Sequence, residues 1–122
     1  MMNSHQGYDV LVKEIHHIEK MDRPSGTAIA TSQGIIKHLD RKTSWTLNTP
    51  TDDFQIEIHT ERIGQVNGTH QVTYSSPIDE ITIEHKAHNR DGFARGAIHA
   101  AHWVSHKKGM YTMKNMLSSG QL

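Results

Sequence analysis

The chain has 122 residues, of which 34% are hydrophobic and 21% charged, and its 13 basic side chains are balanced by 13 acidic ones. This length is enough for one domain with a hydrophobic core. Because the net charge is zero, the chain as a whole has no electrostatic attraction to nucleic acid or to an anionic membrane. The absence of cysteine excludes disulfide bonds and thiolate metal sites, and no apolar run has signal-peptide or membrane-span character, so we expect a soluble cytoplasmic protein.

A strand and a helix, separated by a loop, are the first predicted elements. From Tyr8 the residues alternate in polarity with a period of two, which is typical of a strand. Pro24 disfavours helix at the residue before it and therefore predicts a loop over residues 18–25. Apolar residues then recur at helical spacing over residues 26–40, and Ser25 is well suited to be the N-cap of this helix.

A connector and three alternating runs come next. Residues 41–53 are rich in Thr, Asn, Asp and Pro and are expected to connect the helix to the runs. One-sided alternation predicts a sheet with one buried face and one face that is polar or met by a partner. The three runs cover residues 54–64, 69–76 and 78–88.

A second helix is predicted over residues 90–108, with Gly109 as its expected end and a methionine-rich apolar segment after it. Together the elements predict an α+β fold with a mixed or antiparallel sheet of about four strands and helices packed on one face.

The residues best suited to chemistry surround the start of the first helix. His16 and His17 end the first strand and Lys20 follows closely, which places proton-transfer groups side by side. Gly26 and Thr27 open the helix, where free N–H groups and the helix dipole favour a carboxylate or phosphate. Each feature alone is weak, but together they indicate a site for a small anionic substrate that needs a proton donor.

This stretch resembles the signature of the dihydrodipicolinate reductase family, Glu-x-His-His-x-x-Lys-x-Asp-x-Pro-Ser-Gly-Thr-Ala, which the chain matches over residues 14–28. Two further blocks, within residues 62–70 and 84–97, resemble the family in the expected order. The resemblance covers nearly the whole chain after Tyr8. One departure is Arg23, where the family usually has alanine, and we expect this side chain to face solvent.

The resemblance implies a role for each residue of the signature. His16 would be the general acid/base and Lys20 the proton donor to the reduced ring, whereas His17, Gly26 and Thr27 would bind a small dicarboxylate substrate. The implied reaction is the NADPH- or NADH-dependent reduction catalysed by 4-hydroxy-tetrahydrodipicolinate reductase in the diaminopimelate route to lysine. The family assembles as a homotetramer through the sheets of this domain.

The nucleotide-binding part of such a reductase is not expected in this chain, because no Gly-x-Gly-x-x-Gly turn follows a predicted strand. Residues 1–122 are therefore expected to be the substrate-binding, catalytic and oligomerisation domain, inactive without an N-terminal dinucleotide-binding domain. In the family the last segment returns to pack against that domain. We expect no cofactor-binding residue and no metal ligand in this chain.

The 11 histidines leave a second interpretation open, namely a metal- or anion-binding oligomerisation module without redox chemistry. His99, His102 and His106 are spaced for one face of the second helix. No carboxylate accompanies them there, so we favour a polar helix face. His70 is expected to be a packed residue of the sheet rather than a ligand.

Overall fold

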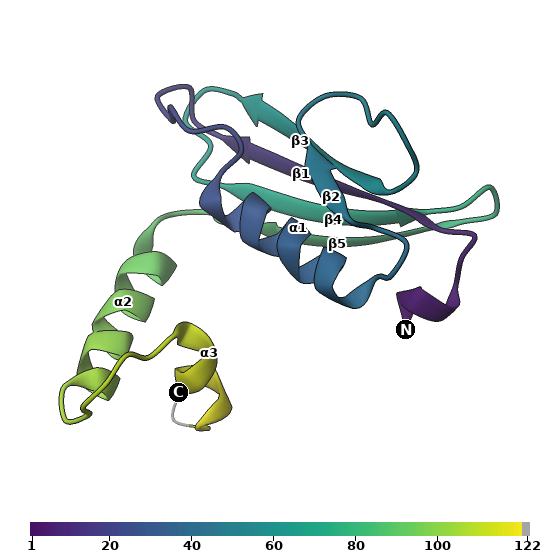
Figure 1. Cartoon of the computed structure of the whole chain (residues 1–122). Helices are drawn as coiled ribbons and strands as arrows, with labels where there is room; N and C mark the ends of the chain where they lie inside the picture. Colours follow the sequence, from purple (N-terminus) through teal and green to yellow (C-terminus); the bar gives the residue numbers. More distant parts are fainter. Residues whose placement is uncertain (121–122) are drawn as a thin grey trace. The chain divides into compact units, whose positions relative to one another are not determined.

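Five strands, three α-helices and one short 3-10 helix form the part of the chain that the computed structural model describes, residues 1–120 (Figure 1). They fall into two compact units, Met1–Ala87 and His88–Leu122. In chain order the elements are η1 (Met2–Ser4), β1 (Asp9–His16), α1 (Gly26–His38), β2 (Ser44–Thr46), β3 (Gln55–Arg62), β4 (Thr69–Ser75), β5 (Glu80–Lys86), α2 (Asp91–Val104) and α3 (Met113–Ser118).

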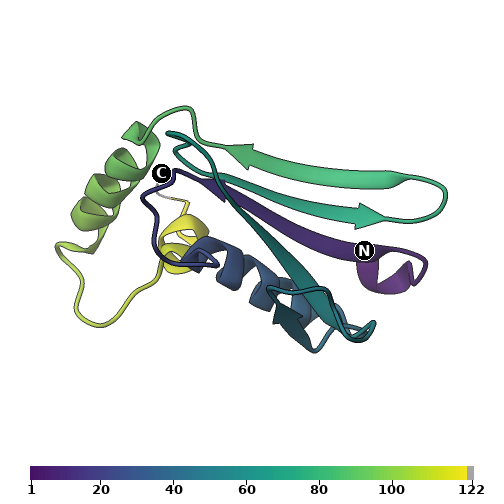
Figure 2. The ribbon, with the colours of Figure 1, turned by 90° about the horizontal axis from the view of Figure 1, so that it is seen from above.

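The first unit is built on a mixed sheet with the strand order β2-β3-β1-β4-β5. The central strand β1 is parallel to β3 and antiparallel to β4, while β2 and β5 extend the two edges. Parallel neighbours need a crossover connection, which α1 supplies between β1 and β3. This helix packs on one face, over β1, β2 and β3 (Figure 2). The predicted α+β fold class is confirmed.

The fifth strand, β2, lies in the segment expected to be a connector. Its three residues run parallel to β3, and Trp45 pairs with Ile56. The side chain of Trp45 packs against the buried core. A strand of three residues is too short to show an alternating pattern, which explains why the sequence predicted only about four strands.

The hydrophobic core lies between α1 and the sheet. Val12 of β1 stands between Ile58 of β3 and Val72 of β4, so neighbouring strands place apolar side chains in one row. The same alternation carries two polar residues, Glu14 and His16, onto the buried face of β1. The buried core residues are Val10, Val12, Ala28, Leu39, Ile56 and Ile58.

A buried lysine joins the beginnings of two strands. The Nζ atom of Lys42 donates to the carbonyl oxygens of Asp53 at 2.8 Å and Gln55 at 2.9 Å, and forms an ion pair with Asp9 at 2.6 Å. All three donors of the ammonium group are therefore used by the protein itself. The role of this lysine is structural.

The second unit contains α2 and α3. The α2 helix ends at Val104, earlier than the predicted residue 108, and Gly109 lies beyond the end with a φ of +125°. The early end has a local cause: the hydroxyl of Ser105 donates to the carbonyl of His102 at 2.8 Å, and the backbone N–H of Ser105 contacts the same carbonyl. A capped, tightened last turn stops the helix before the glycine is reached.

The methionine-rich segment forms α3, which folds back onto α2. Thr112 and Asn115 form a capping box at its start. The ring of Trp103 on α2 meets Tyr111 edge-on with centroids 5.3 Å apart, and its Nε1 donates to Ser119 at 3.2 Å. None of the helices that residues 1–120 form could span a bilayer.

Candidate active site

The centre of the candidate site is a pair of side chains on the buried face of β1. Glu14 is fully buried and His16 is 8% exposed. The Nδ1 atom of His16 is hydrogen-bonded to Oε2 of Glu14. Because alternate residues of a strand share a face, β1 alone brings the two groups together.

Arg62, the last residue of β3, supplies the positive charge that balances Glu14. Its side chain is 3% exposed, and its Nη2 donates to Oε1 of Glu14 at 2.9 Å. The same guanidinium donates to the backbone carbonyls of Lys20 at 3.2 Å and Asp22 at 2.6 Å. A buried carboxylate needs such a partner, since charge removed from water is costly when it is left unpaired.

His70 of β4 faces the pair from the next strand. It lies directly opposite Glu14 in the antiparallel register, and its ring meets that of His16 edge-on with centroids 5.0 Å apart. Burial, followed by the electrostatic effect of His16, lowers the pKa of His70 below its ordinary value of 6.5. The direction of this shift favours the neutral form of His70 at neutral pH.

Ser25 connects this group to the start of α1. Its hydroxyl lies 3.1 Å from Nε2 of His70 and accepts from the backbone N–H of Ala28 at 3.2 Å, which confirms the predicted N-cap. Gly26 and Thr27 follow and are exposed. A Cβ atom built on Gly26 would meet no atom within 4 Å, so the opening turn of α1 is accessible from outside.

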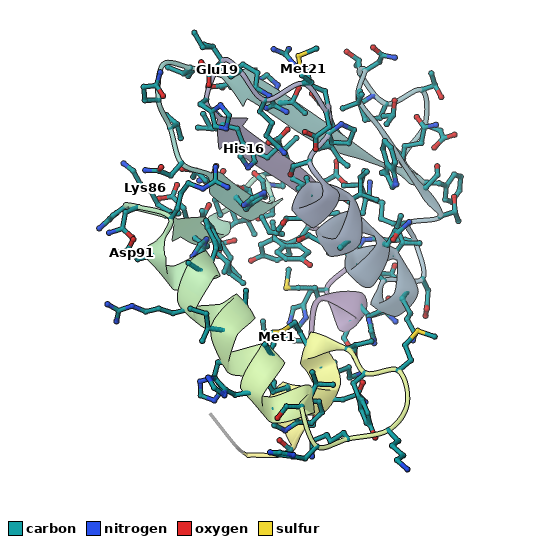
Figure 3. The ribbon with its side chains drawn as sticks, turned by 90° about the vertical axis from the view of Figure 1, so that its left-hand side faces the viewer. Met1, His16, Glu19, Met21, Lys86 and Asp91 are labelled. Carbon is teal, nitrogen blue, oxygen red and sulfur yellow. The ribbon has the colours of Figure 1, made fainter. Side chains whose placement is uncertain are left out.

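Lys20 lies in the loop between β1 and α1, with its Nζ atom 2.8 Å from Oδ1 of Asp22. The hydrogen bond from Lys20 lowers the pKa of Asp22 below its ordinary range. Figure 3 shows His16 below this loop, whose outer residues Glu19 and Met21 are labelled. Arg23 in the same loop is exposed, in agreement with the sequence prediction.

The structure gathers some of the predicted residues more closely than others. His16 and the start of α1 belong to one group, because the rings of His16 and His70 meet edge-on and His70 is hydrogen-bonded to Ser25. Lys20 joins this group through its backbone carbonyl. His17 is half-buried beyond the end of β1, and its carbonyl accepts from the backbone N–H of Lys20 at 3.2 Å.

Two members of the group, Glu14 and Arg62, had no assigned role in the sequence prediction, and His70 was expected to be only a packed residue of the sheet. The burial of Glu14 could have been predicted from the sequence, because this residue continues the alternation of Val10 and Val12. A carboxylate on that face must have a buried partner. The partner itself was not readable: Arg62 is 48 residues away in sequence, and only the parallel pairing of β1 with β3 brings it near.

Glu14, His16 and His70 also place ligand atoms within 4.8 Å of one another, and they are the only group of this kind within residues 1–120. The protein already uses these atoms, because Arg62 binds Glu14 and Ser25 binds His70. A guanidinium beside the carboxylate also opposes a further cation. We therefore describe the group as a side-chain cluster joined by a hydrogen bond and a ring contact.

A surface hollow of about 620 Å³ lies at the opposite end of β1, beside Tyr8 and Asp9. Its basic residues are occupied: Arg41 donates to the carbonyls of Met2 and Tyr8, and Lys42 is buried against β3. The basic groups that could attract an anion are thus already satisfied, and we assign the hollow no role.

Comparison with known proteins identifies the family of this chain. Residues 1–117 match the family described as dihydrodipicolinate reductase, C-terminus. The chain is 46% identical over 118 residues to the 4-hydroxy-tetrahydrodipicolinate reductase of Christiangramia forsetii, covering 97% of this chain and 49% of that protein. It is 38% identical over 120 residues to the reductase of the same name from Chromohalobacter salexigens, covering 92% and 45%.

A solved structure, dipicolinate-bound dihydrodipicolinate reductase from Paenisporosarcina sp. TG-14, matches with a TM-score of 0.64 and 28% sequence identity, covering 88% of this chain and 44% of that one. The matches define the C-terminal part of a reductase. This chain belongs to the dihydrodipicolinate reductase family, which confirms the resemblance found in the sequence. It spans about half the length of the curated relatives it matches.

Proposed function

We propose that this chain is the substrate-binding and catalytic part of a cytoplasmic 4-hydroxy-tetrahydrodipicolinate reductase in the diaminopimelate route to lysine. The observation that carries the proposal is the cluster in which His16, a neutral His70 and the accessible start of α1 lie together. The dipicolinate in the related structure supports a small planar dicarboxylate as the substrate.

In this proposal the start of α1 holds one carboxylate of the substrate. The N–H groups of Gly26 and Thr27 lack intrahelical partners, and the Thr27 hydroxyl adds a further donor. The space beside Gly26 lets an anion approach the backbone. His17 contributes to substrate binding, and the ammonium group of Lys20 offsets the negative charge of the dicarboxylate.

Proton transfer belongs to His16 and Lys20. His16 acts as the general acid/base, and Lys20 donates the proton that must accompany reduction of the ring. A nicotinamide cofactor, NADPH or NADH, supplies the hydride when bound. The 122 residues contain no Gly-x-Gly-x-x-Gly turn. We therefore place the binding site of the cofactor in a nucleotide-binding domain outside this chain. The chain alone is expected to be inactive.

The remaining parts receive roles from the same proposal. The methionine-rich segment after Gly109 packs against the nucleotide-binding domain, and the sheet of residues 1–87 assembles into a homotetramer. The face of the sheet opposite α1 is covered by no helix of the first unit (Figure 2), and it carries the Lys13–Glu61 ion pair of 2.6 Å. A polar, half-buried sheet face suits contact with a second copy.

Binding of 2,6-pyridinedicarboxylate, measured by titration calorimetry, tests the proposal on the chain itself. The wild type should bind, and His16→Ala or Thr27→Val should weaken binding by about tenfold, because each removes one charged or polar contact to the ligand. Thr31→Val, the same change one turn further along α1, is the matched control. Equal binding by all three variants, or no binding by the folded wild type at millimolar ligand, would reject the proposed site.

A further inference from the structure

We propose that Glu14 and Arg62 form a positioning pair, which fixes the tautomer of His16 and ties that histidine to the loop that carries Lys20. The inference rests on the proposed function, in which His16 and Lys20 move protons. It adds the two residues that hold those groups in place without touching the substrate.

The first step concerns the proton on the His16 ring. A carboxylate paired with a guanidinium accepts hydrogen bonds at both oxygens. Oε1 of Glu14 accepts from Arg62, and Oε2 faces Nδ1 of His16. Because Oε2 has no proton to donate, the neutral His16 ring must carry its proton on Nδ1 and leave the lone pair of Nε2 free.

The second step concerns the surroundings of Nε2. Gly68, which precedes β4, borders this side of the ring with a φ of +145°, and a Cβ atom there would lie 3.3 Å from Nε2 of His16. The glycine therefore leaves the basic nitrogen uncrowded. His70 faces the same ring as a neutral imidazole and so does not add a second positive charge beside it.

The third step concerns the second task of Arg62. Besides Glu14, its guanidinium N–H groups also bind the backbone carbonyls of Lys20 and Asp22. One planar group thus holds both the carboxylate behind His16 and the backbone of the lysine. With the carbonyl of Glu61 at 2.7 Å the guanidinium serves four acceptors, which is one more than the three donors of a lysine ammonium group could bind.

A purely structural ion pair would also place Arg62 beside Glu14, so the test must measure something that such a pair does not change. The tautomer of His16 is that quantity. A structural pair leaves the tautomer undetermined, whereas the positioning pair requires the Nδ1–H form. Long-range proton–nitrogen correlation spectra of the 122-residue chain labelled with ¹⁵N-histidine separate the two forms.

In the wild type at about pH 8, where an ordinary imidazole is neutral, the His16 signals should show the Nδ1–H form. Glu14→Gln should shift the ratio of the two tautomers by about tenfold or more toward Nε2–H, because a neutral amide can donate to Nδ1 as well as accept from it. Glu57→Gln is the matched control, since Glu57 lies 4.0 Å from His59 at the same spacing on the other face of the sheet.

Hydrogen exchange at the Lys20 amide, which is bonded to the carbonyl of His17, tests the link to the loop. Arg62→Met should raise the exchange rate of this amide by about tenfold, as expected when a local contact that opposes opening is removed. Arg62→Lys should keep the Nδ1–H form of His16, because the positive charge beside Glu14 remains, but it should not keep the protection of the Lys20 amide. Full protection of the Lys20 amide in Arg62→Lys would overturn the claim that the guanidinium group fixes the loop.

A wild-type His16 in the Nε2–H form overturns the inference directly, and this measurement needs no variant that could fail to fold. None of these spectra requires a dicarboxylate. Nδ1–H at His16 together with absent dicarboxylate binding would therefore reject the proposed function alone, and Nε2–H together with normal binding would reject the positioning pair alone.

Discussion

At the scale of single residues, the notable feature of this chain is a set of buried polar side chains. Glu14, His16 and Ser25 all have hydrogen-bond partners in the described part of the chain. Ser32 of α1 is the exception within residues 1–120, because its hydroxyl is buried with no partner. A buried hydroxyl in this state costs stability, since it has lost its hydrogen bonds to water.

Ser32→Ala should therefore raise the free energy of unfolding by about 1 kcal/mol, because it removes the unsatisfied group and adds the better helix former. Urea unfolding followed by circular dichroism measures the change. Thr31→Ala, one position earlier and only half-buried, serves as the comparison. A loss of stability in Ser32→Ala would show that the hydroxyl has a partner after all.

The lowered pKa of His70 predicts a pH dependence of stability. Below the ordinary value of 6.5 the unfolded chain binds a proton at this histidine that the folded chain does not bind. Stability should consequently fall as the pH drops from about 7 to about 5, and His70→Gln should flatten this part of the profile. His59→Gln removes an exposed histidine as the control. An unchanged profile in His70→Gln would contradict the assigned environment of His70.

At the scale of elements, the start of α1 joins helix capping to the candidate site. Ser25→Ala removes the acceptor of the Ala28 N–H and the partner of His70 together. We expect a loss of about 1–2 kcal/mol in the free energy of unfolding, at the upper end for an N-cap. Ser25→Thr keeps the hydroxyl and should recover most of the loss. A change near zero in Ser25→Ala would mean that the cap does not support α1.

The elements also show what sequence reasoning can and cannot reach. β1 and the capped start of α1 were predictable, because alternation and N-cap chemistry are local signals. The short strand β2 and the early end of α2 were not, since one depends on pairing with β3 and the other on the side chain of Ser105. His16 was readable from the motif, whereas Arg62 depends on a pairing across the whole crossover.

At the scale of the whole molecule, the open face of the sheet is the proposed contact between copies. Thr73 lies on this face, opposite Leu11 of β1 and Thr82 of β5. Thr73→Arg should reduce the mass measured by light scattering from that of an oligomer to that of a monomer, because repeated charge at a closed interface is strongly unfavourable. Lys37→Glu, at an exposed position of α1 away from the sheet face, is the control. A monomeric wild type would contradict assembly through this chain.

The most direct measurement joins this chain to the nucleotide-binding half of a relative, such as the Christiangramia forsetii reductase, and follows oxidation of NADPH or NADH by absorbance. We predict oxidation that depends on the dihydrodipicolinate-type substrate and falls by about 100-fold or more in His16→Ala and in Lys20→Ala, the loss expected for a general acid or base. A folded chimera without this oxidation, or with full activity in both variants, would contradict the account.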